Sequence, residues 1–167
     1  MKAKTPNTNH QNSTWFQVTG ECMSPLIRKE DLVLSIPATK IEIGDVVIIP
    51  GPTPAVHRVV KISNSDHLFT KGDNSLSLDL PITRQYLTGK VIAIVKRGNK
   101  PIYIEGRSWK IKNYLMAKYS FACYSVWKLL SYNNFTLNAY TRVSRSVKSI
   151  HVFIASNITR FKTIRSK

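Results

Sequence analysis

Two apolar runs separated by a proline-rich break indicate the fold of this chain. They lie in the stretch GDVVIIPGPTPAVHRVVKI, which covers residues 44–62. The runs 46–49 and 56–62 are short and rich in valine and isoleucine, which favours β-strands. A Gly-Asp pair precedes the first run, and prolines and a glycine separate it from the second. Because such residues break regular structure, the stretch predicts two short strands bounded by turns.

The same pattern recurs along the first hundred residues. Further short apolar runs occupy residues 15–19, 32–36, 67–70 and 91–95, and turn-forming residues bound them. Several short strands at this spacing predict a mainly β fold, a compact, antiparallel and partly closed β-barrel. With 167 residues, of which 43% are hydrophobic, the chain is long enough for one such domain and an additional region. We expect a disordered arm over 1–14, the barrel over 15–99 and a basic region over 100–167.

The segment Gly20-Glu21-Cys22-Met23-Ser24-Pro25 is the candidate centre of the chemistry. Gly20 permits a bend or the close approach of a ligand, and Pro25 fixes the exit of the chain, so Cys22 can lie at a turn. An adjacent imidazole can stabilise the thiolate of a cysteine and activate it as a nucleophile. His57 lies in an apolar strand-like run 35 residues on. Cys22 is therefore a candidate nucleophile and His57 its base. The alternatives are a cysteine buried as a small hydrophobic side chain and a histidine packed in a strand.

Two aspartates are candidates for orienting this histidine. Asp73 lies in the segment Lys71-Gly72-Asp73-Asn74, and Asp79 follows it. A carboxylate bonded to His57 would hold the productive tautomer, and backbone N–H groups at the Cys22 turn would stabilise an oxyanion. The spacing does not choose between the two aspartates, and Asp73 also suits an ordinary turn. Lys61, expected on the same strand face as His57, is a rival base.

These segments together resemble a known superfamily. Their order along the chain is similar to that of the conserved segments of the type I signal peptidase and LexA-like serine peptidases. The order is Gly20 to Pro25, then 44–47, then 57–60, then 71–74 followed by Asp79. The resemblance is closest to the archaeal and endoplasmic-reticulum type signal peptidases, which use serine, histidine and aspartate. It covers roughly residues 15–98 and places Cys22 at the position of the family's serine.

The resemblance implies an endopeptidase that cuts an extended leader or signal peptide by acyl transfer through Cys22. It implies a barrel fold and a peptide groove beside Gly20, Met23 and Pro25. One alternative is a non-catalytic peptide- or membrane-binding relative that has lost the serine. Another is a LexA-like self-cleaving regulator, which the polar arm disfavours because it is too short for a helix-turn-helix and the chain has no Ala-Gly cleavage pair.

The region after Glu105 differs sharply in charge. Residues 106–167 contain twelve Lys or Arg and no Asp or Glu, within a chain of net charge +16. Apolar residues recur at steps of three and four over 110–132 and again over 143–164, which predicts two amphipathic helices. An anionic membrane surface would attract such helices and bury their apolar sides. The charge alone would also suit nucleic acid, and the apolar stripes could pack on the barrel instead.

Other features of the sequence indicate the compartment in which the protein works and whether it needs a cofactor. Two cysteines, Cys22 and Cys123, do not make a disulfide framework, so we expect free thiols in a reducing, cytoplasmic compartment. The polar start of the chain lacks the apolar core of a signal peptide, and neither predicted helix has the apolar length of a membrane span. We therefore expect a peripheral location on the inner membrane face. The scattered histidines and glycines match no metal or phosphate motif, so no cofactor is expected.

Overall fold

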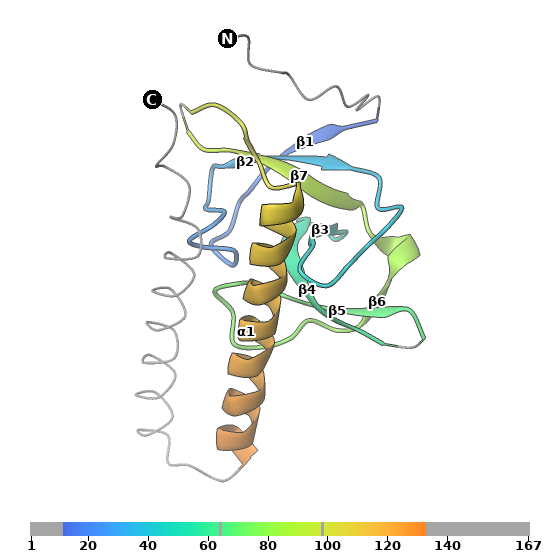
Figure 1. Cartoon of the computed structure of the whole chain (residues 1–167), viewed down its shortest axis with the longest axis vertical. Helices are drawn as coiled ribbons and strands as arrows, with labels where there is room; N and C mark the ends of the chain where they lie inside the picture. Colours follow the sequence, from blue (N-terminus) through green and yellow to red (C-terminus); the bar gives the residue numbers. More distant parts are fainter. Residues whose placement is uncertain (1–11, 64, 98, 133–167) are drawn as a thin grey trace.

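The computed structural model describes residues 12–63, 65–97 and 99–132. Its elements are β1 (Thr14–Gln17), β2 (Leu32–Ile36), β3 (Val46–Ile49), β4 (Ala55–Ile62), β5 (His67–Lys71), β6 (Ile82–Thr83), a 3₁₀ turn η1 (Arg84–Tyr86), β7 (Gly89–Val95), β8 (Ile102–Tyr103) and α1 (Arg107–Tyr132) (Figure 1). The prediction of a mainly β fold is confirmed. The predicted second amphipathic segment, 143–164, and most of the predicted arm lie outside the described residues.

The strands form one antiparallel sheet that curls into a half-barrel. Their order is β1-β2-β7-β3-β4-β5-β6, with β8 paired to β7. The pair β3–β4, which comes from the stretch 44–62, lies in the middle of this order, with Val47 opposite His57. Each predicted apolar run became a strand, whereas the two-residue strands β6 and β8 carried no comparable pattern in the sequence.

Both faces of the central strands are buried. Val46 and Ile48 of β3 lie in one apolar cluster, and Val47 lies in a second cluster on the opposite face. Because successive strand residues point to opposite faces, burial on both sides requires a continuous apolar run rather than an alternating one. This explains the unbroken Val-Val-Ile-Ile of residues 46–49.

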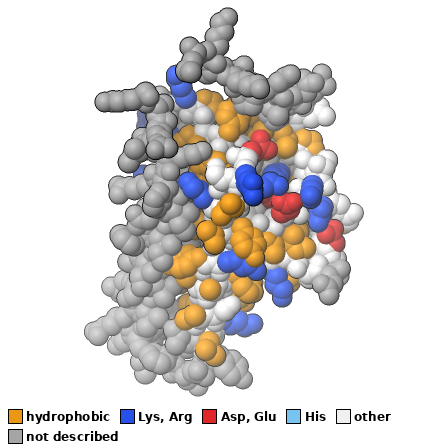
Figure 2. Space-filling model, in the orientation of Figure 1, with side chains coloured by type: hydrophobic (Ala, Val, Ile, Leu, Met, Phe, Trp, Pro, Cys, Tyr) orange, Lys and Arg blue, Asp and Glu red, His pale blue; other side chains and the backbone are white. Residues whose placement is uncertain are grey.

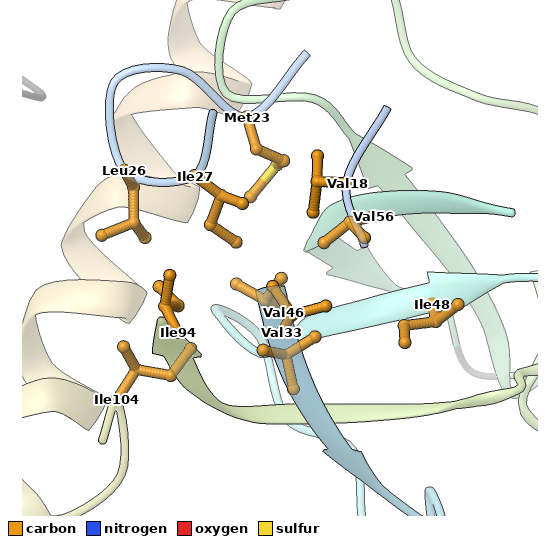
Figure 3. Close-up of a cluster of buried hydrophobic side chains, with 11 residues drawn as sticks. Val18, Met23, Leu26, Ile27, Val33, Val46, Ile48, Val56, Ile94 and Ile104 are labelled. Carbon is orange, nitrogen blue, oxygen red and sulfur yellow. The ribbon is translucent and has the colours of Figure 1, made fainter. Parts of the chain in front are cut away.

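The larger cluster joins the sheet to the loop that carries Cys22. It consists of Val18, Met23, Leu26, Ile27, Val33, Val46, Ile48, Val56, Val91, Ile94 and Ile104 (Figure 3). In Figure 3, Met23 and Ile27 of the loop point toward the side chains of the sheet. The loop is therefore anchored by burial of its own apolar residues.

Helix α1 packs along the sheet and its last turns extend past β5 (Figure 1). The predicted helix is confirmed, but the apolar stripe seen in the sequence is not the side that packs. Residues Asn113, Met116, Ala117 and Ser120 are buried, whereas Ile111, Leu115 and Val126 are exposed. The packed side includes polar residues because it meets buried charged groups of the sheet. Among the described residues, no helix is both long and apolar enough to cross a membrane.

Candidate active site

The Cys22 loop is held in place from below by the core. Met23 is fully buried, and the backbone N–H of Ile27 donates to the Met23 carbonyl at 3.0 Å. Because Met23 has no exposed surface, it packs under the loop and supports it rather than lining a groove. Gly20 is exposed with open space around it, and Pro25 is half-buried, so both remain candidates for peptide contact.

Cys22 is half-buried beside the strand that carries His57. Its Sγ lies 3.6 Å from the carbonyl oxygen of Val56 in β4, one residue before the histidine, and as a thiol it would donate to that oxygen. Cys22 also interacts with the imidazole itself and helps to raise the pKa of His57. Two of the predicted groups, separated by 35 residues in sequence, therefore meet at one place.

Asp79 is the carboxylate that contacts His57. The two groups are joined by Nδ1 and Oδ2 at 2.6 Å. The Thr70 hydroxyl donates to the same Oδ2 at 2.7 Å, and the Asp79 N–H donates to the Thr70 carbonyl at 3.0 Å. These bonds fix the carboxylate against β5. Because Nδ1 is occupied by Asp79, Nε2 is the ring nitrogen left to face a reacting group.

The environment of His57 changes its proton affinity. Burial disfavours the charged imidazolium and lowers the pKa, but the interactions with Asp79 and Cys22 outweigh burial and raise it from 6.5 to about 9. His57 is therefore protonated at neutral pH. A cation beside the Cys22 sulfur can stabilise negative charge on that atom.

Asp73 lies elsewhere and has a different partner. Its two carboxylate oxygens accept from Nε and Nη2 of Arg58 at 2.8 and 2.7 Å, and both side chains are buried. Arg58 also donates to the carbonyl of Gly44 and to Oδ1 of Asn113 on α1, at 2.9 and 3.0 Å. Asp73 therefore does not orient His57; it neutralises a buried arginine, which sequence spacing alone did not indicate.

The turn that contains Asp73 nevertheless forms a wall of the site. The Asn74 N–H donates to the Cys22 carbonyl at 2.7 Å, and the Asn74 side chain donates to the Glu21 carbonyl at 3.3 Å. A Cβ on Gly72 would lie 2.7 Å from the Cys22 carbonyl oxygen. Since no side chain fits there, glycine is required for this close approach.

The rival base Lys61 is directed elsewhere. Its ammonium lies over the ring of Phe69, 5.3 Å from the centroid. Both residues line an apolar cleft of about 560 Å³ between the sheet and α1. His57 and Lys61 therefore do not share one site, because a register shift between Val59 and Lys61 changes the alternation along β4.

Sequence reasoning missed one buried cation, Lys71. Its Nζ donates to Ser120 Oγ of α1 at 2.7 Å and to the Gly72 carbonyl at 3.0 Å. Burial lowers the pKa of Lys71 to about 8. The sequence does not single out Lys71 within the segment Lys71-Gly72-Asp73-Asn74. Its partner is a polar residue on the packed side of α1, and this pairing exists only in the folded chain.

The residues present do not suggest a metal centre, since within the described part of the chain no three His, Cys, Asp or Glu residues gather as metal ligands.

The structure brings together Cys22, His57 and Asp79 and separates Asp73 from them. Comparison with known proteins adds no assignment, because no family model, curated protein or solved structure matches the chain significantly.

Proposed function

We propose that this protein is a cysteine endopeptidase of the signal-peptidase-like type that cuts an extended leader or signal peptide. The observation that carries the proposal is the convergence of Cys22, His57 and Asp79 from three separate segments, with His57 and Asp79 2.6 Å apart. The curled antiparallel sheet and the order of the sequence segments support the same family resemblance.

The chemistry follows acyl transfer. The Cys22 thiolate attacks the scissile carbonyl carbon, and the C=O electron pair moves to the oxygen as a tetrahedral oxyanion forms. Protonated His57 gives its Nε2 proton to the leaving amine as the C–N bond breaks, which leaves a thioester on Cys22. Neutral His57 then takes a proton from water, whose oxygen attacks the thioester and releases the acid product. Asp79 holds the imidazole in position throughout.

The raised pKa of His57 suits this assignment. A nucleophile that is a thiol rather than an alcohol works best as a preformed thiolate next to an imidazolium. With its pKa at about 9, His57 carries the required proton at neutral pH. Asp79 contributes by stabilising that cation.

A labelling experiment tests the nucleophile. Iodoacetamide should modify Cys22 much faster than Cys123, which is also a half-buried free cysteine, and His57→Ala should slow modification of Cys22. His67→Ala is the matched control, because the ring of His67 is bonded to the exposed hydroxyl of Ser65, at 2.9 Å. Equal rates for the two cysteines in the wild-type chain would contradict the proposal.

A second variant separates an active cysteine peptidase from a relative that has lost its serine. A C–S bond is longer than a C–O bond, and a displacement near 1 Å can cost about a hundredfold in rate. Cys22→Ser should therefore lower cleavage of a mixed library of extended peptides, measured by mass spectrometry against Cys22→Ala. Increased cleavage by the serine variant would indicate a serine site, and peptide binding without cleavage by either form would support a binding module.

The same measurements address self-cleavage. A LexA-like regulator would shorten its own chain, so the intact mass of the wild-type protein would change with time and that of Cys22→Ala would not. We expect a stable intact mass and cleavage of the added peptides.

We also propose that α1 rests on an anionic membrane surface. Its outward side carries exposed Ile111, Leu115, Val126 and Leu129. The helix has four lysines and one arginine but no acidic residue. Figure 2 shows hydrophobic side chains interspersed with Lys and Arg over this side of the molecule. Apolar groups flanked by cations suit the boundary between headgroups and acyl chains, whereas nucleic acid would leave the apolar groups without a partner.

A further inference from the structure

Lys71 is a buried lysine directly before the turn that touches Cys22. It is 1% exposed, and its Nζ donates to Ser120 Oγ and to the Gly72 carbonyl. A buried ammonium is costly unless it is hydrogen-bonded, so these two bonds determine where the side chain lies. One bond reaches helix α1 and the other reaches the turn.

The turn in question is in direct contact with the backbone of the nucleophile. Gly72 lies so close to Cys22 that an added Cβ would be 3.0 Å from the Cys22 Cβ as well as 2.7 Å from its carbonyl oxygen. Asn74, at the other end of the turn, donates to the same carbonyl. A shift of the turn would therefore move the Cys22 backbone or break its contacts.

Helix α1 holds this turn through two contacts. Ser120 binds Lys71 before the turn, and Asn113, two turns of helix earlier, binds the arginine that neutralises Asp73 within it. The helix is seated closely, since a Cβ on Gly44 would lie 2.7 Å from the Asn113 backbone. The two contacts fix the helix and the turn relative to each other.

We infer that Lys71 and Ser120 are positioning residues for the Cys22 site: they tie α1 to the Gly72–Asn74 turn and thereby set the place of the nucleophile relative to His57. This inference rests on the proposed function. It gives the packed side of α1 a role within the site, in addition to the surface role of its outward side.

The charge of Lys71 provides a readout of this role. Burial lowers its pKa to about 8, whereas the nearby Asp73, Cys123 and Asp79 act to raise it and Arg58 acts to lower it. The ammonium therefore loses its proton within the range in which thiol modification is measured. The pH profile of Cys22 modification in the wild-type chain should show an inflection near pH 8, in addition to the one that His57 gives near pH 9.

The test compares Ser120→Ala, Lys71→Met and the double variant in the full-length chain. Ser120→Ala is the gentlest change because it removes one oxygen from a buried helical position and alanine suits a helix. Lys61→Met is the control, since this lysine lies on the neighbouring strand with its ammonium over the Phe69 ring. The second-order rate of iodoacetamide modification at Cys22 is measured from pH 6 to pH 10 by peptide mapping, with circular dichroism to verify folding.

We expect each single variant to slow modification of Cys22 by about tenfold at pH 7.5, since small displacements have large effects on rate. The double variant should be no slower than the single variants, because the two residues act through one contact. The inflection near pH 8 should disappear in Lys71→Met and move to lower pH in Ser120→Ala, where the ammonium has lost an acceptor. A residue with only a structural role would lower stability without changing the profile.

The outcomes distinguish this inference from the proposed function. If Cys22 of the wild-type chain reacts no faster than Cys123, the proposed function fails. If wild-type Cys22 is reactive but folded Ser120→Ala keeps the wild-type rate and profile, the positioning role alone is overturned. If Lys71→Met does not fold, Ser120→Ala decides the question by itself.

Discussion

Replacing Asp73 with asparagine should destabilise the protein strongly, although the change is nearly isosteric. Asp73 binds Arg58 through two bonds of 2.8 and 2.7 Å, and the side chains are 1% and 0% exposed. Removing one partner of a buried ion pair leaves a charge without compensation and costs about 3–5 kcal/mol. Arg58 keeps its bonds to Gly44 and Asn113, so we expect the lower end, about 3 kcal/mol.

The measurement is urea unfolding followed by tryptophan fluorescence. A loss of about 3 kcal/mol would remove a large part of a typical stability of about 5–15 kcal/mol, and it would lower the melting temperature by roughly 6–12 °C in a chain of this size. Asp66→Asn is the matched control. Its carboxylate binds Arg84 at 2.9 Å, but the two side chains are 60% and 30% exposed.

An exposed pair of this kind contributes only about 0–1 kcal/mol. If Asp73→Asn lost no more stability than Asp66→Asn, the account of Asp73 as the neutralising partner of a buried arginine would be refuted. If Arg58→Met with Asp73→Leu recovered much of the loss, the cost would be assigned to the unpaired charge rather than to the turn.

Three other predictions concern His57 and the helix surface. Asp79→Asn should lower the pKa of His57 from about 9, because burial is then opposed by the interaction with Cys22 without the help of Asp79, and NMR titration of the imidazole checks this. A pKa of His57 raised from 6.5 to about 9 stabilises the folded protein by about 3 kcal/mol below pH 6.5, and this contribution should be lost as the pH rises through 9. His57→Gln should therefore be less stable than wild type at pH 6 and similar to it at pH 10. An equal loss of stability at both pH values would contradict this linkage. The full-length chain should sediment with anionic vesicles, and both 1 M salt and the double variant Leu115→Gln/Leu129→Gln should reduce the sedimented fraction. Stronger binding to duplex DNA than to vesicles at the same salt would contradict the membrane placement.

The sequence was sufficient to predict the elements that depend on local pattern. Short β-branched runs between turn residues predicted the strands around His57, and a three-to-four residue repeat predicted α1. The chemistry of the residue types also indicated Cys22, His57 and the two aspartates as candidate catalytic residues. Each of these inferences uses residues that are close together in the chain or have distinctive side-chain chemistry.

The tertiary structure decided which of these residues are partners. Asp79 rather than Asp73 reaches His57 because the loop after β5 returns to bond Thr70. No local pattern encodes that path.

The sequence also suggested the wrong packing side for α1. Its apolar residues formed the visible stripe, yet the side that packs contains Asn113 and Ser120, which lie 55 and 49 residues from their partners Arg58 and Lys71. Buried cations require acceptors, and which residues can supply them depends on where distant segments meet in space. Periodicity along the chain therefore determined the elements, and only the tertiary structure determined how charges are neutralised around the site.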